Sequence, residues 1–387
     1  MMTALRRLFS VGLVASLVPL TAMAPADAAE TIAREAILMD ADTGTILLDK
    51  DADKSMPPAS MSKLMTVYLV FQRLKEGALA LDDTFIVSEN AWRKGGAKSG
   101  SSTMFLLPGE KPTVHDLLRG IIVQSGNDAC IVVAESLAGS EEIFADAMTA
   151  KGREIGLTGS TFRNATGWPH PEHRMTARDL AVLARRTIID FPEYYHIYSE
   201  LEFTHNKVRQ RNRNPLLYKG MGADGLKTGH TSEAGYGLVA SAKRGDQRLI
   251  LVVNGLKSRR ERSTEPQRLL EWGFRTYRNY ALFNAGEQVD VAEVWLGDKG
   301  QVPLLIERDV TLTLARNARA SLKATVIYDN PLPAPVSKGQ EMAKLRITAD
   351  GMAPLEIPLV AGDDAHRLGF FGRMNSALRF LLLGESG

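Results

Sequence analysis

The first half of the chain carries a helical pattern of hydrophobic residues. Apolar side chains recur every three or four positions, which predicts helices that bury one face. The stretch from 60 onward follows two prolines and runs into an unbroken apolar pattern. Ser140 is placed to cap one of the later helices. The helices are expected at 60–76, 113–124, 128–139, 140–156 and 177–191.

Segments before and after these helices change to the two-residue period of strands. Residues 35–53 alternate around Asp42-Thr43-Gly44, which predicts a β-hairpin at a sheet edge. Residues 235–244 and 247–257 read as antiparallel strands joined at Gly245-Asp246, and a helix at 265–280 follows. Short strand and turn pieces are expected at 77–88 and 102–113. The pattern therefore predicts a mixed α/β domain whose sheet unites strands distant in sequence, with the helices between them.

A third pattern begins near residue 285. Short alternating segments are broken by proline, glycine and Asp-Asn, and no helical period is present. This is typical of a small all-β module, which we place at 285–363. It holds no cluster of catalytic residue types, so a spacing or interaction role is expected.

The N-terminus resembles a secretory signal. Arg6 and Arg7 precede an apolar run, 8–20, that is too short for a comfortable membrane span. Cleavage is expected after Ala26-Asp27-Ala28 or Ala22-Met23-Ala24. We therefore assign 1–29 to a signal peptide and 30–284 to the first domain, and expect the mature chain to work outside the cytoplasm.

The C-terminal residues 364–387 form an amphipathic pattern with a basic polar face. Such a helix fits a membrane interface and is too short and too charged to span a bilayer. The alternative is a helix that docks on the protein's own core. On the polar face lie Arg373, Ser376 and Arg379. On the apolar face lie Phe370, Phe371, Met374, Ala377, Leu378, Leu381 and Leu382.

Composition narrows the function only slightly. The 387 residues carry a net charge of +2, which gives no reason to expect a nucleic-acid partner. The single cysteine, Cys130, lies in an apolar helical run and is expected to be a buried small hydrophobe. No intramolecular disulfide can form, so the core must stabilise the fold.

A possible nucleophile lies at the start of the first predicted helix. Ser60 and Lys63 are three residues apart, so on a helix the Lys63 amine can reach the Ser60 hydroxyl. A serine hydroxyl becomes nucleophilic when a neighbouring base takes its proton. Lysine can be that base if burial or another cation lowers its pKa. A capping serine with a solvated lysine is the structural alternative.

Two further short motifs follow in the chain. Ser125-Gly126-Asn127 lies between two predicted helices, where it could place a hydroxyl and an amide on a cleft or simply cap the helices. Lys227-Thr228-Gly229 opens a predicted strand, and its glycine would let a peptide approach the backbone. S-x-x-K, S-x-N and K-T-G in this order are the signature of penicillin-binding proteins and class A β-lactamases.

The mature sequence resembles the low-molecular-mass penicillin-binding proteins, the S11-type serine D-alanyl-D-alanine carboxypeptidases. The resemblance covers nearly the whole chain, including the all-β module and the terminal helix. It implies a transpeptidase-like α/β fold of helices packed on an antiparallel sheet. The stretches that carry it are PASMSKLMT, LLRGIIVQSGNDAC, EYYHIYSE, NRNPLL, DGLKTGHT and LLEWGF.

The resemblance also implies roles for the motif residues. Ser60 would form the acyl-enzyme and Lys63 would be its base. Ser125 would relay a proton to the leaving amine, and Asn127 would hold the substrate amide and Lys63. Lys227 would support Ser125 and the anionic end of the substrate.

Substrate binding is expected along the K-T-G strand. Thr228 and Gly229 would line the substrate, and the backbone N–H groups of Ser60 and His230 would form the oxyanion hole. The His230 side chain is expected to be a cleft wall, since no triad-like Asp/His pair accompanies Ser60. Arginines expected near the terminal carboxylate are Arg262 and, as a further candidate, Arg213.

No metal or cofactor is expected. His170, Glu172 and His173 are close in sequence, but the intervening prolines and the missing i, i+4 pair argue against a zinc site. The expected partners are a peptidoglycan stem peptide ending in D-Ala-D-Ala, β-lactams as covalent inhibitors, and a membrane surface. The expected location is the periplasm, on the outer face of the cytoplasmic membrane.

Three other functions remain open at this stage. A D,D-endopeptidase would use the same residues on a cross-linked peptide. A β-lactamase would need a positioned glutamate, but no E-x-x-L-N run follows the S-x-N triplet, and Glu172 lies in a Pro/His-rich loop. A cell-wall binding protein on an inactive scaffold is the non-enzyme alternative, and the intact motifs argue against it.

Overall fold

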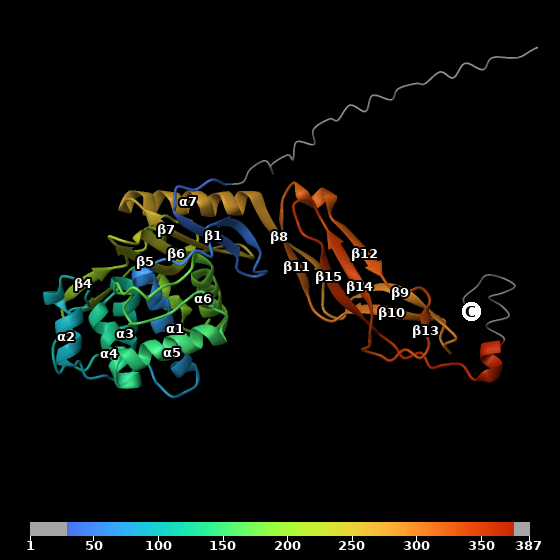
Figure 1. Cartoon of the computed structure of the whole chain (residues 1–387), viewed down its shortest axis with the longest axis horizontal. Helices are drawn as coiled ribbons and strands as arrows, with labels where there is room; N and C mark the ends of the chain where they lie inside the picture. Colours follow the sequence, from blue (N-terminus) through green and yellow to red (C-terminus); the bar gives the residue numbers. More distant parts are fainter. Residues whose placement is uncertain (1–28, 375–387) are drawn as a thin grey trace, which may run out of the picture.

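A computed structural model of the chain describes residues 29–374. It contains a larger α/β module and a smaller all-β module, joined end to end (Figure 1). The signal peptide expected at 1–29 lies almost entirely outside the described residues, as does the last part of the expected terminal helix.

A five-stranded antiparallel sheet forms the centre of the larger module. The strand order is β2-β1-β7-β6-β5. The predicted hairpin around Asp42-Thr43-Gly44 is present, and its second strand, β2, is the sheet edge. The strands are β1 (Glu35–Asp40), β2 (Ile46–Lys50), β5 (Ala223–Thr231), β6 (Gly235–Arg244) and β7 (Gln247–Leu256).

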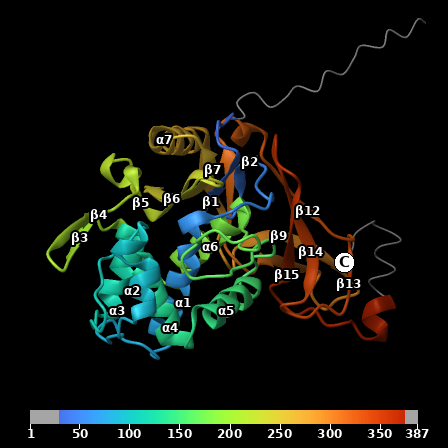
Figure 2. The same cartoon turned by 60° about the vertical axis from the view of Figure 1, so that its left-hand side comes forward.

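Both faces of this sheet are buried, in two separate cores. Successive side chains of a strand point to opposite faces. Accordingly, Ile37 belongs to the core shared with the helices α1, α4 and α6, whereas Leu38 packs with Leu270 of α7 (Arg259–Thr276). Figures 1 and 2 show α7 on one side of the sheet and the other helices on the opposite side. This confirms the predicted α/β class.

The helices between β2 and β5 begin at side-chain caps where the sequence offers them. Ser140 accepts a hydrogen bond from the Ile143 amide, as predicted, and Thr113 accepts one from the Asp116 amide. The helices are α1 (Lys63–Lys75), α2 (Glu89–Gly95), α3 (Val114–Arg119), α4 (Asn127–Ala138), α5 (Glu141–Glu154) and α6 (Ala177–Asp190).

Several local predictions were wrong. The stretches 77–88 and 102–113 form no strands, although the bridge between Thr84 and Thr113 and backbone hydrogen bonds such as that from Val87 to Glu110 join them. Helix α2 and the hairpin of β3 (Glu202–His205) and β4 (Val208–Arg211) were not predicted. Their sequences are short and rich in charge, so neither has a clear apolar period.

The last helix of the larger module also differs from its prediction. Helix α7 starts at Arg259, six residues before the predicted start at Glu265, because Ser258 caps it through the Glu261 amide. It ends at Thr276, where strand β8 (Tyr277–Phe283) begins. Strand β8 pairs with β11 (Val310–Ala315), a strand of the second module.

The second module is all-β, as predicted. Its main sheet has the order β12-β14-β15-β10-β9-β13, and the pair β8–β11 lies beside it. Alternate residues such as Val302, Leu304 and Ile306 fill one apolar core. Its strands are β9 (Gln288–Trp295), β10 (Gln301–Ile306), β12 (Lys323–Ile327), β13 (Leu332–Pro333), β14 (Glu341–Thr348) and β15 (Leu355–Ala361).

Polar side chains join the two modules. The Thr43 hydroxyl in the β1–β2 turn lies 2.6 Å from the Thr313 hydroxyl on β11. Asn279 on β8 donates to Asp40 and Asp42, at 3.3 and 3.2 Å, and accepts from Thr313 at 2.7 Å. The turn of the first hairpin is therefore the docking point of the second module.

The described end of the chain is apolar and exposed. Residues 370–374 are helical, and Phe370, Phe371 and Met374 are 67%, 78% and 58% exposed. Among residues 29–374, no helix combines the length and apolar character that crossing a bilayer requires.

Candidate active site

Ser60 and Lys63 meet at the start of α1. Residues Ala59–Ser62 form a 3₁₀ turn, η1, that leads directly into the helix at Lys63. Lys63 Nζ donates to Ser60 Oγ at 3.0 Å and also to the carbonyl of Thr166. The i, i+3 contact expected from the sequence is therefore formed, with the amine held between a hydroxyl and a fixed carbonyl.

Two glycines allow other segments to approach the η1 turn closely. At Gly167, with φ of +77°, an added Cβ would lie 2.0 Å from the Ala59 carbonyl oxygen. At Gly229 on β5, a Cβ would lie 3.0 Å from Met61 Cγ and from the Pro58 oxygen. The η1 turn thus packs against the loop after α5 on one side and the K-T-G strand on the other, which only glycine permits.

Burial controls the chemistry of Lys63. Its side chain is fully buried, and this desolvation lowers its pKa to about 8. The positive charge of Arg213 acts in the same direction, while Cys130 and Glu141 oppose the shift. A lysine with this pKa is partly neutral near physiological pH and can accept the Ser60 proton.

Lys227 lies buried on β5, in the neighbourhood of Lys63. Desolvation lowers its pKa well below the ordinary value, and the charge of Lys63 adds to the effect. Its Nζ donates to the carbonyl of Thr228 at 3.3 Å. The K-T-G motif lies inside the strand rather than at its start, because β5 begins at Ala223.

Ser125 has an unusual backbone at a helix break. Residues Gly120–Gln124 form a π-helical turn after α3, and Ser125 adopts a left-handed conformation with φ of 67°. A non-glycine residue in this region is uncommon and is often found at functional sites. The Ser125 hydroxyl oxygen is buried and has no hydrogen-bond partner among residues 29–374.

Asn127 begins α4 two residues later. Its side-chain nitrogen, Nδ2, donates to Ser101 Oγ at 3.0 Å. Its side-chain oxygen, Oδ1, is buried without a partner among the described residues. The contacts implied by the resemblance, Lys227 with Ser125 and Asn127 with Lys63, are not formed in this structure. The unpaired oxygens of Ser125 and Asn127 retain their capacity to bind a substrate.

A buried carboxylate, Asp128, holds the loop 102–106 in place near Ser125. Asp128, fully buried on α4, accepts from the Thr103 hydroxyl at 2.6 Å and from the amides of Met104 and Leu106 at 2.8 and 3.2 Å. Charge-assisted bonds of this kind are the stronger ones. Asp128 therefore ties the 102–106 loop to the same turn that carries Ser125.

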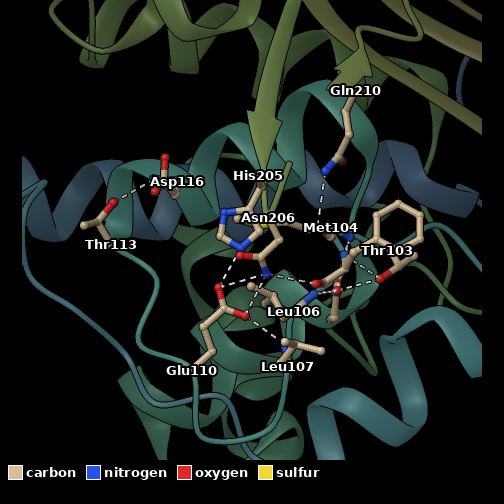
Figure 3. A network of polar contacts seen from close by, with 12 residues as sticks. Thr103, Met104, Leu106, Leu107, Glu110, Thr113, Asp116, His205, Asn206 and Gln210 are labelled. Carbon is tan, nitrogen blue, oxygen red and sulfur yellow. Dashed lines mark hydrogen bonds and ion pairs between the residues drawn. The ribbon is translucent and has the colours of Figure 1, made fainter. Parts of the chain in front are cut away.

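The β3–β4 hairpin contacts this loop at Met104 and the segment that follows it at Glu110 (Figure 3). His205 lies 2.8 Å from Glu110 Oε1, and Asn206 donates to both oxygens of the same carboxylate. Gln210 donates to the carbonyl of Met104 at 3.2 Å. The hairpin that the sequence analysis missed thus supports one wall of the site.

A cavity of about 570 Å³ opens over these groups. Ser60, Ser125, Thr228, Gly229 and Arg262 line it, as the resemblance implies, while Lys63, Asn127 and Lys227 are buried residues outside that lining. His230 is a wall of the cavity, with its ring 3.9 Å from that of Tyr236. The remaining lining residues are Ser102, Arg213, Pro215, Tyr236 and Arg259.

Cations dominate the side of the cavity next to β5. Arg262 Nη1 donates to the Gly229 carbonyl at 3.4 Å, and its guanidinium lies over the Tyr236 ring at 5.3 Å. Burial, and then the charge of Arg259, lower the pKa of Arg262 to about 10. Burial and the nearby charges of Arg262 and Arg259 also lower the pKa of His230. This region is suited to binding a carboxylate.

Several residues of the site were not among those predicted from the sequence. Thr166 acts through its carbonyl, which any residue type carries, so no sequence signal could identify it. Tyr236 faces His230 across the β5–β6 ladder, a relation that follows from the hairpin register. Arg259 lies one helical turn before Arg262, a spacing that would have indicated a shared face once α7 was known to start at Arg259.

Comparison with known proteins identifies this arrangement. Residues 21–258 match the family described as D-alanyl-D-alanine carboxypeptidase, Peptidase_S11, and residues 277–367 match the C-terminal domain of penicillin-binding protein 5. The chain belongs to the S11 D-alanyl-D-alanine carboxypeptidase family. The first match ends just before α7, and the second begins just after it.

Individual members of the S11 family are similar along most of the chain. D-alanyl-D-alanine carboxypeptidase DacC of Escherichia coli K12 is 43% identical over 345 residues, covering 88% of this chain and 86% of the relative. DacA of the same strain is 37% identical over 348 residues, covering 89% and 86%. Penicillin-binding protein 5 of Haemophilus influenzae has a similar structure, with a TM-score of 0.80, 37% identity, and coverage of 88% and 99%.

These findings confirm the fold and the enzyme class that the sequence resemblance implied. The chain is an S11-type serine carboxypeptidase with a transpeptidase-like α/β domain and a C-terminal all-β domain. The match to penicillin-binding structures also confirms its place among the penicillin-binding proteins.

Proposed function

We propose that this enzyme removes the terminal D-alanine from peptidoglycan pentapeptide stems through an acyl-enzyme on Ser60. The observation that carries the proposal is the 3.0 Å contact between Ser60 Oγ and a buried lysine amine whose pKa is about 8. Penicillins would acylate the same hydroxyl, which makes them covalent inhibitors.

Acylation would begin when neutral Lys63 takes the Ser60 proton. Ser60 Oγ then attacks the carbonyl carbon of the penultimate D-alanine, and the backbone N–H groups of Ser60 and His230 would stabilise the oxyanion. Ser125 would pass a proton to the leaving amine, as the C–N bond breaks. Water would then hydrolyse the ester and release Ser60.

Substrate orientation would come from the cationic side of the cavity. Thr228 and Arg262 would hold the terminal carboxylate, with Gly229 allowing the peptide to lie close to β5. The unpaired side-chain oxygen of Asn127 would accept a hydrogen bond from the peptide N–H, and its side-chain nitrogen would donate one to the peptide carbonyl. Lys227 would hold Ser125 in place once substrate is bound.

The direct test measures penicillin labelling and D-alanine release on the same samples. We expect Ser60→Ala to lose both, and Ser55→Ala, a change at an exposed serine just upstream, to keep both. A stable acyl-enzyme with wild type supports the carboxypeptidase, rapid penicillin turnover supports a β-lactamase, and no labelling supports a binding protein. Cleavage of a cross-linked peptide dimer without release of terminal D-alanine would support the endopeptidase.

We also propose that the enzyme works in the periplasm, attached to the outer face of the cytoplasmic membrane by its C-terminal helix. The exposure of Phe370, Phe371 and Met374, with Arg373 between them, supports an interfacial position. Removal of 370–387 should move the protein from the membrane fraction to the soluble fraction. Equal membrane recovery of the shortened chain would contradict this attachment.

A further inference from the structure

Three arginines share the cavity with the nucleophile. Arg213, from the segment after β4, and Arg259 and Arg262, from the first turn of α7, all line it. No aspartate or glutamate is among the lining residues. Within residues 29–374, none of the three guanidinium groups is within ion-pair distance of a carboxylate, so their charges are not neutralised by the protein.

The hydrogen bonds of these arginines are made to neutral groups. Arg213 Nη1 donates to Ser102 Oγ at 2.5 Å, and Arg262 Nη1 donates to the Gly229 carbonyl. The Nε of Arg262 is buried without a partner. The charge of Arg259 contributes to the lowered pKa of both Arg213 and Arg262, after burial, which shows that the three cations repel one another. Bound anions would relieve that repulsion.

One terminal carboxylate does not use all of this charge. It carries a single negative charge, which Arg262 and the Thr228 hydroxyl are placed to bind. Arg213 and Arg259 then remain on the cavity wall without an anionic partner. The cavity volume of about 570 Å³, which the acyl part and the leaving residue share, is within the usual range of small-molecule sites.

The position of Arg259 indicates which part of the substrate it faces. It precedes Arg262 by three residues, so both lie on one face of α7. Arg262 contacts the Gly229 carbonyl on the strand proposed to hold the terminal carboxylate. The charge of Arg259 therefore lies on the side of the cavity proposed to hold the leaving residue, next to Arg262.

We propose that Arg259, together with Arg213, binds a second carboxylate on the leaving residue, so that the enzyme favours leaving groups that are diacids. This inference rests on the proposed carboxypeptidase reaction and specifies its leaving group. The chemistry stays the same: the amide C–N bond breaks, the leaving amine gains a proton, and water cleaves the Ser60 ester. Such a leaving group could be a terminal acidic D-amino acid, or the diamino diacid of a cross-linked strand that ends at this residue, so that both of its carboxyl groups are free.

The test compares three peptides with the same acyl part, diacetyl-L-lysyl-D-alanyl, that end in D-alanine, D-glutamate or D-glutamine. D-Glutamate and D-glutamine have nearly the same shape and differ in charge, so the ratio of their kcat/KM values reports the second carboxylate. We expect wild type to favour D-glutamate by about tenfold, the size of one charge-assisted contact. Arg259→Gln should reduce the ratio to about one, in line with loss of that contact.

Arg260→Gln is the matched control. Arg259 and Arg260 are both exposed and lie on the same helical turn, but only Arg259 lines the cavity, so the Arg260 variant should keep the wild-type ratio. Full labelling of Arg259→Gln by penicillin would show that its site is folded. A wild-type ratio near one, or an unchanged ratio in Arg259→Gln, would overturn the proposal. Absence of D-alanine release from the D-alanine peptide would instead overturn the carboxypeptidase reaction itself.

A second arm separates the two sources of a diacid. A cross-linked peptide dimer, whose leaving strand ends at the diamino diacid with both carboxyl groups free, is incubated with wild type and with Arg259→Gln. Cleavage that falls by about tenfold in the variant would assign the arginine pair to the cross-linked strand. Cleavage confined to the D-glutamate peptide would assign it to a terminal acidic residue. Either result supports the diacid site, provided that the charge ratio of the first arm is found.

Discussion

The Ser60 hydroxyl and the Lys63 amine are 3.0 Å apart, and the amine is completely removed from solvent. The first fact follows from an i, i+3 spacing on a helical turn. The second depends on two segments distant in sequence, because the Thr166 carbonyl accepts from the amine and Lys227 of the K-T-G strand lies close enough for the two charges to interact. Proximity gives a path for the proton, and burial lowers the pKa of the amine so that part of it is neutral, and able to accept a proton, near neutral pH.

This pairing predicts a pH dependence of acylation. Lys63 must be neutral to take the proton, and its lowered pKa of about 8 means that the neutral fraction rises with pH up to that value. The penicillin acylation rate should increase by about tenfold per pH unit below about pH 7 and level off above about pH 8. Stopped-flow labelling with a fluorescent penicillin measures it, and a flat profile across this range would contradict the role of Lys63. Lys63→Arg should lower the rate by about 10³-fold, since arginine stays protonated.

Gly167 provides a test of how closely the site is packed. In Gly167→Ala, the new methyl group would be 2.0 Å from the Ala59 oxygen and 2.6 Å from Ser62 Oγ, so the η1 turn must move. Gly156→Ala is the matched control, because Gly156 also has a positive φ, +92°, but no atom within 4 Å of the added carbon. We expect a cost of about 1 kcal/mol for Gly156→Ala from backbone strain, and a clearly larger cost for Gly167→Ala, with slower acylation. Urea denaturation and labelling rates measure both, and equal effects of the two changes would refute the packing argument.

Asp128 should matter for both stability and activity. Asp128→Ala leaves the amides of Met104 and Leu106 without their buried acceptor, so we expect a loss of about 3 kcal/mol of unfolding free energy. Because the same helix start carries Asn127, acylation should also slow. Asp82→Ala, at an exposed aspartate, is the control and should stay within about 0.5 kcal/mol of wild type. A normal stability for Asp128→Ala in chemical denaturation would show that the loop is held by other contacts.

Arg262 should act on the charge of the substrate terminus. Arg262→Gln removes a cation placed for the terminal carboxylate, and kcat/KM for a D-Ala-D-Ala peptide should fall by about 10²-fold. A peptide with an amide in place of that carboxylate should be cleaved poorly by wild type and hardly more slowly by the variant. If both peptides lose the same factor, Arg262 supports the fold of the cavity rather than the carboxylate.

The sequence predicts the elements of this site better than their junctions. Ser60 and Lys63 could be paired from spacing alone, and the helices flanking Ser125 could be recognised from their apolar period. The π-helical turn and the left-handed backbone at Ser125 could not be predicted, because they depend on how α3 and α4 are held by Asp128 and the 102–106 loop. The hairpin β3–β4 is stabilised by tertiary contacts to Glu110 and Met104. Its own sequence is rich in charge and does not indicate these contacts.

The contact between the Thr43 and Thr313 hydroxyls and the hydrogen bonds of Asn279 hold the β module against the first hairpin of the larger module. A β module held in this way sets the distance between the cavity and any surface that binds the C-terminal end of the chain. Peptides at that distance from the surface would be the ones within reach of the cavity, so position as well as sequence would select the substrates.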